Sequence, residues 1–533
     1  MKVRAGSLVV GVVLAALSAS CRDLPEANGP APVVRIATTT LTGVTVASTP
    51  AVASFRGLPY ARPPVGERRW AAPEPAALPP GPFDASRFAA ACYQDSYNTV
   101  WYRRVGAAFG VGPEQFSDPP VSEDCLYLNV WAPVAGLGGS ARKPVLVWVH
   151  GGSNRAGWSF EPNYDGSHLA ARGDVVVVTI AYRLGVFGFY AHPDLASTGA
   201  PANAGLLDQI EALRWVQGHI AAFGGDPDNV TVAGESAGAA DIAYLIASPR
   251  ARGLFRRAIS ESGGYALRRT PTLAEAQQLA VAIGNGLAVP DIGRQRELPA
   301  ATVFAAAAAA TAGQRPGPVI DGHVVTAPLG ASLAAAGSGV DLLIGSNENE
   351  YDMYVDDDVA GLERTLAALP PSVSAALAPR ARAQGSIRRG HAWVAGFTDM
   401  NCPPYVMAAQ AAAGGHAAYV YRFARVRPGP GGQVLLAYHG AEVPYVFGTH
   451  DAWLPGDDAE HALTTAMMDH WLRFLRTGNP NADPTGGAPP DWPSWNPAAP
   501  QVMRFDRSTR AIEAPEAALC TALAPDIYAG LVR

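Results

Sequence analysis

The chain is poor in lysine and carries no strong charge of either sign. Only Lys2 and Lys143 are lysines among its 40 basic residues, which face 46 acidic residues and leave a formal net charge of −6. A mildly acidic balance without blocks of basic residues argues against a nucleic-acid-binding protein. No nucleic-acid partner is therefore expected.

Long hydrophobic runs are also missing. Beyond the N-terminus, every stretch of about 18 residues contains a charged residue or a proline, so we expect no transmembrane helix. Apolar residues nevertheless make up 48% of the 533 residues. This is enough for a large buried core, and it excludes a globally disordered chain.

The N-terminus has the pattern of an export signal. Lys2 and Arg4 precede an apolar run at residues 8–17, and small residues follow at 18–20. This pattern predicts a signal peptide over residues 1–20. A tether rich in proline and alanine (residues 21–34) and one folded domain (residues 35–533) would follow.

Cys21 leaves two forms of the exported protein open. The sequence LSASC before and at Cys21 resembles a bacterial lipobox, which would make Cys21 a lipid anchor at a membrane surface. The alternative is ordinary cleavage nearby and a soluble product. The expected location is the bacterial periplasm, the extracellular space or, with the anchor, a membrane surface.

Cysteine is scarce, and its number fits an oxidising compartment. Without Cys21, four cysteines remain, which are Cys92, Cys125, Cys402 and Cys520. An even number suggests two disulfides, although four cysteines allow three connectivities and four buried thiols are the alternative. No CxxC motif or histidine-rich cluster is present, so no structural zinc site is expected.

Short continuous apolar runs predict buried strands. The clearest are residues 144–149, 175–180, 230–232 and 342–344. Continuous rather than alternating apolarity is typical of a strand that is covered on both faces. A helical pattern over residues 203–222 lies between two of them. We therefore expect a single large α/β domain with a central, mostly parallel sheet and helices on both faces.

The strongest chemical motif is GESAG at residues 234–238. It directly follows a predicted strand and precedes a helical stretch. A G-x-S-x-G motif in this context predicts a sharp strand-to-helix turn that exposes the serine hydroxyl above the sheet edge. Ser236 is thus the candidate nucleophile.

A second motif, HGGS, follows another predicted strand at residues 150–153. Acyl transfer builds negative charge on a carbonyl oxygen, and backbone N–H groups aimed at that oxygen stabilise it. Small residues let the backbone come close. The expected donors are the N–H groups of Gly152, Ser153 and Ala237, the last one next to Ser236.

Taken together, the motifs resemble the type B carboxylesterase/cholinesterase family of α/β-hydrolases, over nearly the whole mature chain. The matching segments are FRGLPYA (55–61), SEDCLYLNVW (122–131), AYRLG (181–185), GLLDQ (205–209) and FGGDP (223–227). Several motifs in the family's order make the resemblance specific. It implies an α/β-hydrolase fold and a serine carboxylic-ester hydrolase.

The resemblance also implies the partners of Ser236. In GSNENEY (345–351), Glu350 takes the place of the family's acid, and Glu348 is a competitor because Asn349 and Tyr351 depart from the usual pattern. In HGAEVPYVFG (439–448), His439 takes the place of the base. Ser262 is implied as a partner of the acid. The implied disulfides are Cys92–Cys125 and Cys402–Cys520.

The expected reaction is hydrolysis of a small-molecule ester through an acyl-enzyme, without cofactor or metal, by a monomer or homodimer. A non-catalytic surface adhesion module of the same fold and a lipase or amidase are the alternatives. Where cholinesterases carry a choline-binding tryptophan, this chain has Gln115 beside Phe116. Arg155 would favour acidic esters if it pointed into the site, or else it pairs with a carboxylate or faces solvent.

Overall fold

The computed structural model describes residues 31–49, 51–139, 141–198, 202–267, 269–310, 317–336, 339–481 and 491–528. The expected signal peptide and Cys21 lie outside the described residues. Within the described part, no helix combines the length and the hydropathy that crossing a bilayer requires.

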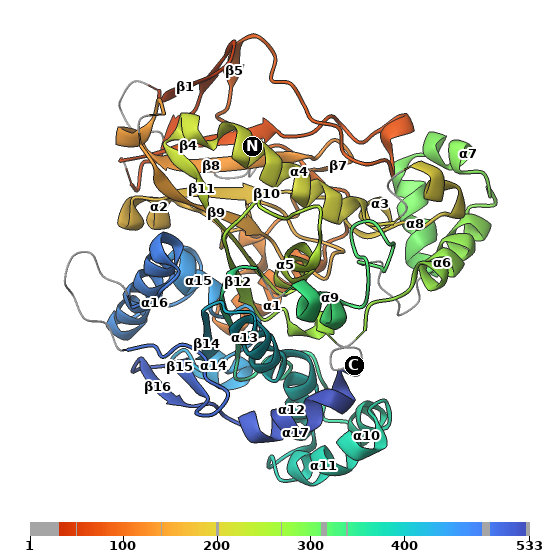
Figure 1. Cartoon of the computed structure of the whole chain (residues 1–533), viewed down its shortest axis with the longest axis vertical. Helices are drawn as coiled ribbons and strands as arrows, with labels where there is room; N and C mark the ends of the chain where they lie inside the picture. Colours follow the sequence, from red (N-terminus) through yellow and green to blue (C-terminus); the bar gives the residue numbers. More distant parts are fainter. Residues whose placement is uncertain are drawn as a thin grey trace, which may run out of the picture.

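The fold is built around a large sheet (Figure 1). Among the described residues this sheet has 11 strands, and seven neighbouring ones, from β10 to β15, run parallel. In spatial order the strands are β16 (Arg510–Glu513), β15 (Gln501–Phe505), β14 (Ala418–Phe423), β13 (Asp341–Asn347), β12 (Arg257–Glu261), β11 (Gly225–Glu235), β9 (Lys143–Val149), β10 (Val176–Ile180), β8 (Tyr127–Pro133), β4 (Val52–Pro59) and β3 (Val44–Thr45). The sheet is mixed and mostly parallel, as the apolar runs predict.

Smaller sheets lie outside this central one. Strands β1 (Val33–Ile36), β2 (Thr39–Thr42) and β5 (Gly81–Asp84) form one of them, and β6 (Ala91–Cys92) pairs with β7 (Val121–Ser122) in another.

Helices cover both faces of the sheet. The side chains of β9 alternate between two apolar clusters, because successive residues of a strand point to opposite faces. Val147 belongs to one cluster and Trp148 to the other. The first cluster includes residues of α4 (Ala204–His219), α5 (Ala237–Ala247), α9 (Leu329–Ala336) and α13 (Pro403–Ala413). The second includes residues of α2 (Ser167–Gly173), α15 (Val443–Phe447) and α16 (Asp458–Thr477).

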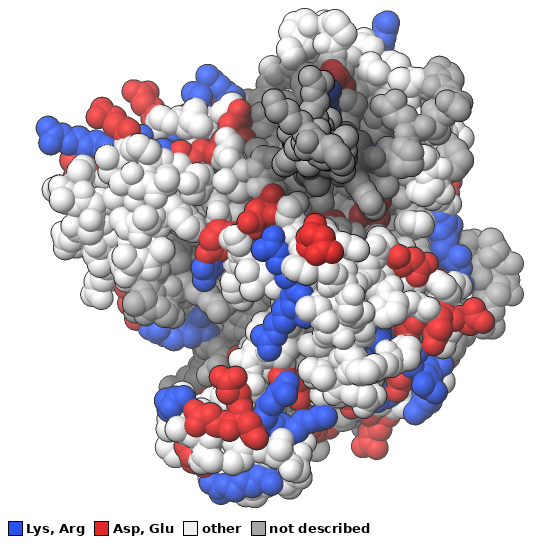
Figure 2. Space-filling model, turned by 180° about the vertical axis from the view of Figure 1, so that it is seen from behind, with Lys and Arg blue, Asp and Glu red and all other residues white. Residues whose placement is uncertain are grey.

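Further helices gather away from the sheet (Figure 1). One group consists of α3 (Gly185–Gly188), α6 (Leu273–Gly286), α7 (Ile292–Glu297) and α8 (Ala300–Ala310). Another consists of α10 (Val359–Ala367), α11 (Pro371–Arg382), α12 (Ile387–Gly396) and α17 (Ala517–Ile527). The remaining ones are α1 (Tyr97–Ala108) and α14 (Pro430–Leu435). Figure 2 shows that acidic and basic side chains are intermixed on the face turned away from the view of Figure 1.

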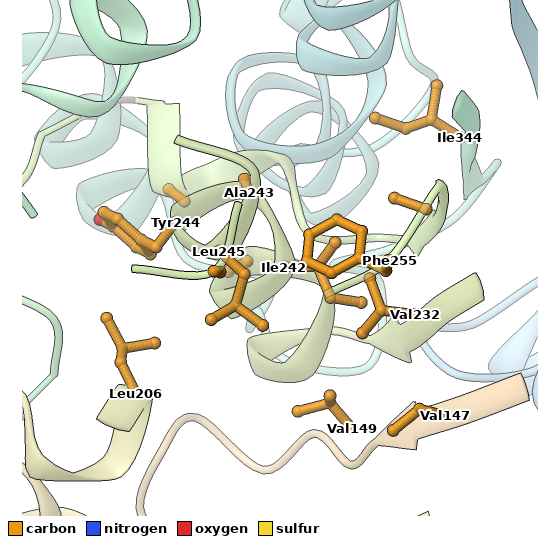
Figure 3. Close-up of a cluster of buried hydrophobic side chains, with 14 of the residues drawn as sticks. Val147, Val149, Leu206, Val232, Ile242, Ala243, Tyr244, Leu245, Phe255 and Ile344 are labelled. Atoms are coloured by element: carbon orange, nitrogen blue, oxygen red, sulfur yellow. The ribbon is translucent and has the colours of Figure 1, made fainter. Parts of the chain in front are cut away.

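Helix α5 is held tightly against the middle of the sheet. Ile242 and Leu245 of this helix are almost completely buried together with Val147 and Val232 of the two adjacent strands (Figure 3). The packed interface leaves the helix little freedom to shift. It therefore fixes the turn between β11 and α5, which lies at the carboxyl edge of the parallel strands, where α/β folds place their sites.

Candidate active site

Ser236 occupies the turn between β11 and α5. Its backbone has φ 53° and ψ −121°, a conformation that non-glycine residues rarely adopt. The Ser236 N–H donates to the carbonyl of Glu261 at the end of the adjacent strand, at 2.8 Å. The surrounding packing and this bond hold the strained turn, and they fix the position of the serine hydroxyl.

The two glycines of the GESAG motif are required by close backbone contacts. A Cβ atom on Gly238 would lie 2.1 Å from the carbonyl oxygen of Val149, and one on Gly234 would lie 2.6 Å from the same oxygen. Both distances are far below van der Waals contact. Helix α5 can therefore start directly beside β9 only because these positions carry no side chain.

His439 lies between Ser236 and Glu350. Its Nε2 is 2.8 Å from Ser236 Oγ, and its Nδ1 is 2.6 Å from Glu350 Oε2. A carboxylate only accepts, so Nδ1 carries the proton and Nε2 is the acceptor for the serine hydroxyl. The loop after β13 supplies Glu350, and the segment between α14 and α15 supplies His439. The structure brings the three predicted residues together in one hydrogen-bonded chain.

The second carboxylate oxygen of Glu350 is bound independently of His439. Glu350 Oε1 accepts from Ser262 Oγ and from the Asn347 N–H, both at 2.6 Å. The Asn347 side chain donates to the Tyr438 carbonyl at 2.7 Å, which ties the acid loop to the histidine loop. Asn347 was not singled out from the sequence. The competitor Glu348 instead pairs with Arg504 at 2.9 Å, and its side chain is 45% exposed.

The HGGS loop passes directly beside the nucleophile. Gly151 approaches so closely that a Cβ there would lie 3.0 Å from Ser236 Cβ. Gly152 has φ +111°, and a Cβ on it would meet the Ala156 carbonyl oxygen at 2.1 Å. Residues 151–153 and Ser236 line the same cavity. The loop conformation thus depends on glycine at the position where the sequence places an oxyanion donor.

The site has the three parts of a serine hydrolase. They are a serine on a strand-to-helix turn, a Ser–His–Glu hydrogen-bond chain, and a glycine-rich loop after the adjacent strand. A model of the carboxylesterase family matches residues 30–371 and 376–521. The chain belongs to the carboxylesterase family.

Similar proteins and solved structures support the same family. The chain is 35% identical to the para-nitrobenzyl esterase of Bacillus subtilis over 483 residues, which cover 87% of this chain and 93% of the relative. It is 33% identical to the fumonisin B1 esterase of Sphingopyxis macrogoltabida, covering 85% and 83%. The solved structure of Geobacillus stearothermophilus carboxylesterase EST55 superimposes with a TM-score of 0.78 at 32% identity, covering 92% of this chain and 99% of that one. The protein is therefore a serine hydrolase that acts on esters.

The site of this esterase opens into a large cavity. Its volume is about 1600 Å³, and Ser236 and His439 are among the residues that line it. Tyr97 and Trp101 of α1 and Tyr354 line it as well. The cavity is therefore wide enough for bulky esters, and aromatic rings form part of its wall.

Aromatic residues of α1, rather than Gln115, form part of the cavity wall. Gln115 is not among the residues that line the cavity, and Phe116 is buried against Tyr102 and Trp453. Trp101 lines the cavity instead.

Glu235, the residue before the nucleophile, is a site residue that sequence reasoning missed. Its Oε1 makes no hydrogen bond and lies 3.2 Å from His439 Nε2. Burial raises the pKa of Glu235 to about 7, with opposing effects from His439 (lowering) and Glu350 (raising). The sequence feature that could have identified Glu235 is its place inside the GESAG motif.

His439 is surrounded by carboxylates. Burial acts to lower its pKa, but the charges of Glu235 and Glu350 outweigh burial and raise the pKa to about 10. A histidine that must accept a proton has to be neutral beforehand. Because the two groups interact strongly, a proton held by Glu235 removes part of this effect and makes His439 available as a base at a lower pH.

Arg155 pairs with a carboxylate rather than lining the cavity. Its Nε donates to Asp95 Oδ2 at 3.0 Å, and its guanidinium lies 5.2 Å from the ring centre of Tyr97. Arg155 is not among the cavity-lining residues. The sequence left open whether Arg155 selects acidic esters or pairs with a carboxylate, and the structure shows the pairing.

Both disulfides join the cysteines that the family resemblance implies. Cys92–Cys125 closes a segment with a sequence separation of 33, and this segment carries α1 with Tyr97 and Trp101. Cys402–Cys520 joins α17 to the residue before α13 across a sequence separation of 118. The first disulfide supports the cavity wall, whereas the second one joins helices at the C-terminal part of the fold.

Proposed function

We propose that Ser236 is the nucleophile, His439 the general base and Glu350 the residue that orients His439. The observation that carries the proposal is the unbroken hydrogen-bond chain from Ser236 Oγ through both nitrogens of His439 to Glu350. A serine hydroxyl is a weak nucleophile unless a base takes its proton as it attacks. Neutral His439 presents that base at hydrogen-bond distance.

The reaction proceeds in two steps. Ser236 Oγ attacks the ester carbonyl while His439 Nε2 takes its proton, and the imidazolium then protonates the departing alcohol. Water, activated by the same nitrogen, hydrolyses the acyl-enzyme. Glu350 keeps the proton on Nδ1 and stabilises the imidazolium throughout.

We assign the oxyanion donors to the backbone N–H groups of Gly152, Ser153 and Ala237. The proximity of residues 151–153 to Ser236 supports this assignment. Donors of this kind are aimed before the substrate arrives, so they stabilise the developing oxyanion without reorganisation.

The proposed substrates are esters with a bulky or aromatic group. The cavity of about 1600 Å³ and its aromatic side chains support this class. The similarity to a para-nitrobenzyl esterase points the same way.

Hydrolysis of p-nitrophenyl butyrate and of a p-nitrobenzyl ester tests the proposal. Ser236→Ala should reduce kcat by about 100,000-fold or more, because an activated serine cannot be replaced by water alone. A fluorophosphonate probe should add one adduct to the wild type, on the peptide that contains Ser236, and none to Ser236→Ala.

Two outcomes would point elsewhere. No activity and no adduct in folded, oxidised wild type would favour the non-catalytic adhesion module. Activity on tributyrin that rises sharply only above its solubility limit would favour an interfacial lipase over an esterase.

We also propose that the protein is exported, either with Cys21 lipidated or as a soluble product of ordinary cleavage nearby. The presence of two disulfides supports an oxidising compartment. Labelling with a fatty acid in a bacterial host distinguishes the forms, because Cys21→Ala abolishes incorporation only if Cys21 is the anchor. The monomer or homodimer expected from the family is measured by light scattering on the same material.

A further inference from the structure

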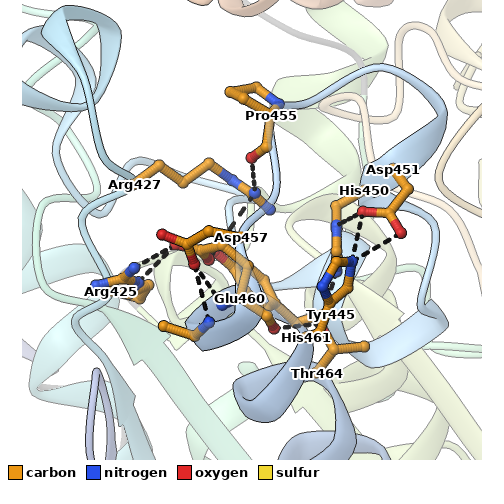
Figure 4. Close-up of polar contacts among 11 residues, drawn as sticks. Arg425, Arg427, Tyr445, His450, Asp451, Pro455, Asp457, Glu460, His461 and Thr464 are labelled. Carbon is orange, nitrogen blue, oxygen red and sulfur yellow. Dashed lines mark hydrogen bonds and ion pairs between the residues drawn. The ribbon is translucent and has the colours of Figure 1, made fainter.

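Three potential metal ligands converge outside the active site, where the chain enters α16. His450 and Asp451 belong to a single helical turn (His450–Ala452), and His461 lies on the first turns of α16 (Figure 4). The ligand atoms of the three side chains all lie within 4.8 Å of one another. Asp451 Oδ1 is 2.6 Å from His450 Nδ1, and Asp451 Oδ2 is 2.9 Å from His461 Nε2.

The hydrogen bonds of His450 leave its Nδ1 as an acceptor. Thr464 Oγ1 donates its only proton to the Glu460 carbonyl at 2.9 Å. With its proton in that bond, Oγ1 accepts from His450 Nε2, which lies 2.8 Å away. In a neutral imidazole with its proton on Nε2, Nδ1 carries the lone pair that binds metals, and the Thr464 hydroxyl fixes this tautomer.

The lone pair of His450 Nδ1 has no hydrogen-bond donor and faces a carboxylate oxygen. The His450 side chain is only 2% exposed. Two acceptors at 2.6 Å repel each other unless a cation lies close to both of them. The competing cation is a proton, which would turn His450 into a buried imidazolium.

The surrounding backbone is held in place, and a glycine lets it pass close to two of the ligand atoms. A Cβ added to Gly456 would lie 2.9 Å from Asp451 Oδ1 and 3.4 Å from His450 Nδ1, so the missing side chain keeps this position open. Arg427 donates to the Pro455 carbonyl at 2.9 Å, and Trp453 Nε1 donates to Asn163 at 3.1 Å. Bonds of this kind hold ligands in advance, so binding does not have to order the loop.

We propose that His450, Asp451 and His461 bind a divalent transition-metal ion, with Zn²⁺ as the best fit. Two imidazole nitrogens and one carboxylate suit zinc and its neighbours, whereas Mg²⁺ and Ca²⁺ prefer sites made only of oxygen ligands. Ligand atoms around one tetrahedral zinc ion, each at about 2.0–2.2 Å from it, are about 3.3–3.6 Å apart, a spacing that small side-chain movements reach from the present one.

The site ties the turn at residues 450–454 to α16. Trp453, which lies on this turn, packs against Tyr102 and Phe116 in the segment closed by the first disulfide. The ion would therefore stabilise the fold near the cavity wall, and the proposal does not depend on the proposed catalytic residues.

Calorimetric titration of chelator-treated protein with Zn²⁺ tests the proposal. Wild type should bind one equivalent, and Mg²⁺ at the same concentration should give no binding. His461→Gln and Asp451→Asn change side chains that are 53% and 63% exposed, so both variants should fold. Each should weaken Zn²⁺ binding at least tenfold.

Two further variants separate the site from its alternatives. His416→Gln is the matched control, because His416 is a partly exposed histidine that lies 3.9 Å from another carboxylate, Asp341. It should bind Zn²⁺ like the wild type. Gly456→Ala should weaken binding by filling the open position. Zn²⁺ should raise the melting temperature of wild type and His416→Gln but not that of His461→Gln.

The proposal is overturned if wild type binds less than one equivalent, or if His461→Gln binds Zn²⁺ as tightly as wild type. An imidazolium signal for His450 in the NMR spectrum at neutral pH, unchanged by added Zn²⁺, would also overturn it and assign the proton as the cation.

Discussion

Ser262 and Glu350 are joined by a hydrogen bond of 2.6 Å that leaves the other carboxylate oxygen to His439. The serine holds the carboxylate from the side opposite the histidine. Its hydroxyl comes from the loop after β12, and a backbone φ of 55° places it there.

Ser262→Ala should lower kcat for p-nitrophenyl butyrate by about tenfold, with little change in KM. A hydrogen bond to a charged group contributes about 1.5–3 kcal/mol, and part of this is retained through the Asn347 N–H. Steady-state kinetics on the purified variant measures the effect. An increase in KM with unchanged kcat would show that Ser262 supports substrate binding instead of the acid.

Glu235→Gln should move the acidic limb of the kcat/KM profile to lower pH by about one pH unit or more. The negative charge of Glu235 favours the imidazolium, so its removal lowers the pKa of His439 and more of the neutral base is present at a given pH. Profiles between about pH 5 and about pH 11 measure the shift, because the limb follows the pKa of His439, which is about 10 in the wild type.

A shift of that limb to higher pH, or no shift, would contradict the electrostatic role of Glu235. Glu348→Gln provides the control, because Glu348 pairs with Arg504 at the surface and should leave the profile unchanged.

Gly152→Ala should reduce kcat by about 100-fold or more while the protein remains folded. The new Cβ would clash with the Ala156 carbonyl oxygen at a backbone φ of +111°, so the donor loop must move. Gly218→Ala is the matched control. A Cβ there meets nothing within 4 Å, and alanine should stabilise α4 by up to about 1 kcal/mol. Equal activity of the two variants would show that the HGGS loop is not critical.

Removing each disulfide should affect different properties. Cys402→Ala/Cys520→Ala should lower the free energy of unfolding by about 2–5 kcal/mol, because a separation of 118 residues constrains the unfolded chain strongly, and kcat/KM should change little. Cys92→Ala/Cys125→Ala should raise KM as well, because it loosens the segment that carries Trp101. Denaturant titrations and kinetics on both pairs test this, and identical kinetic behaviour would contradict it.

Much of the fold and of the candidate site could be predicted because the information is local. Continuous apolar runs predict β9, β10, β11 and β13, and a serine flanked by glycines after a strand predicts the turn at Ser236. Each of these signals depends on a short segment whose backbone has few alternatives. The positions of Glu350 and His439 came from motifs in the family's order rather than from residue chemistry alone.

The tertiary structure decided which side chains meet across segments. It brings Glu235 to His439, places Trp101 rather than a residue at position 115 in the cavity wall, and pairs Arg155 with Asp95. Neither a motif nor a hydrophobic period encodes such contacts, because they depend on how loops of variable length cross the carboxyl edge of the sheet. His450 and His461 illustrate the same limit. Their approach requires the turn before α16, and the sequence shows only two separated histidines.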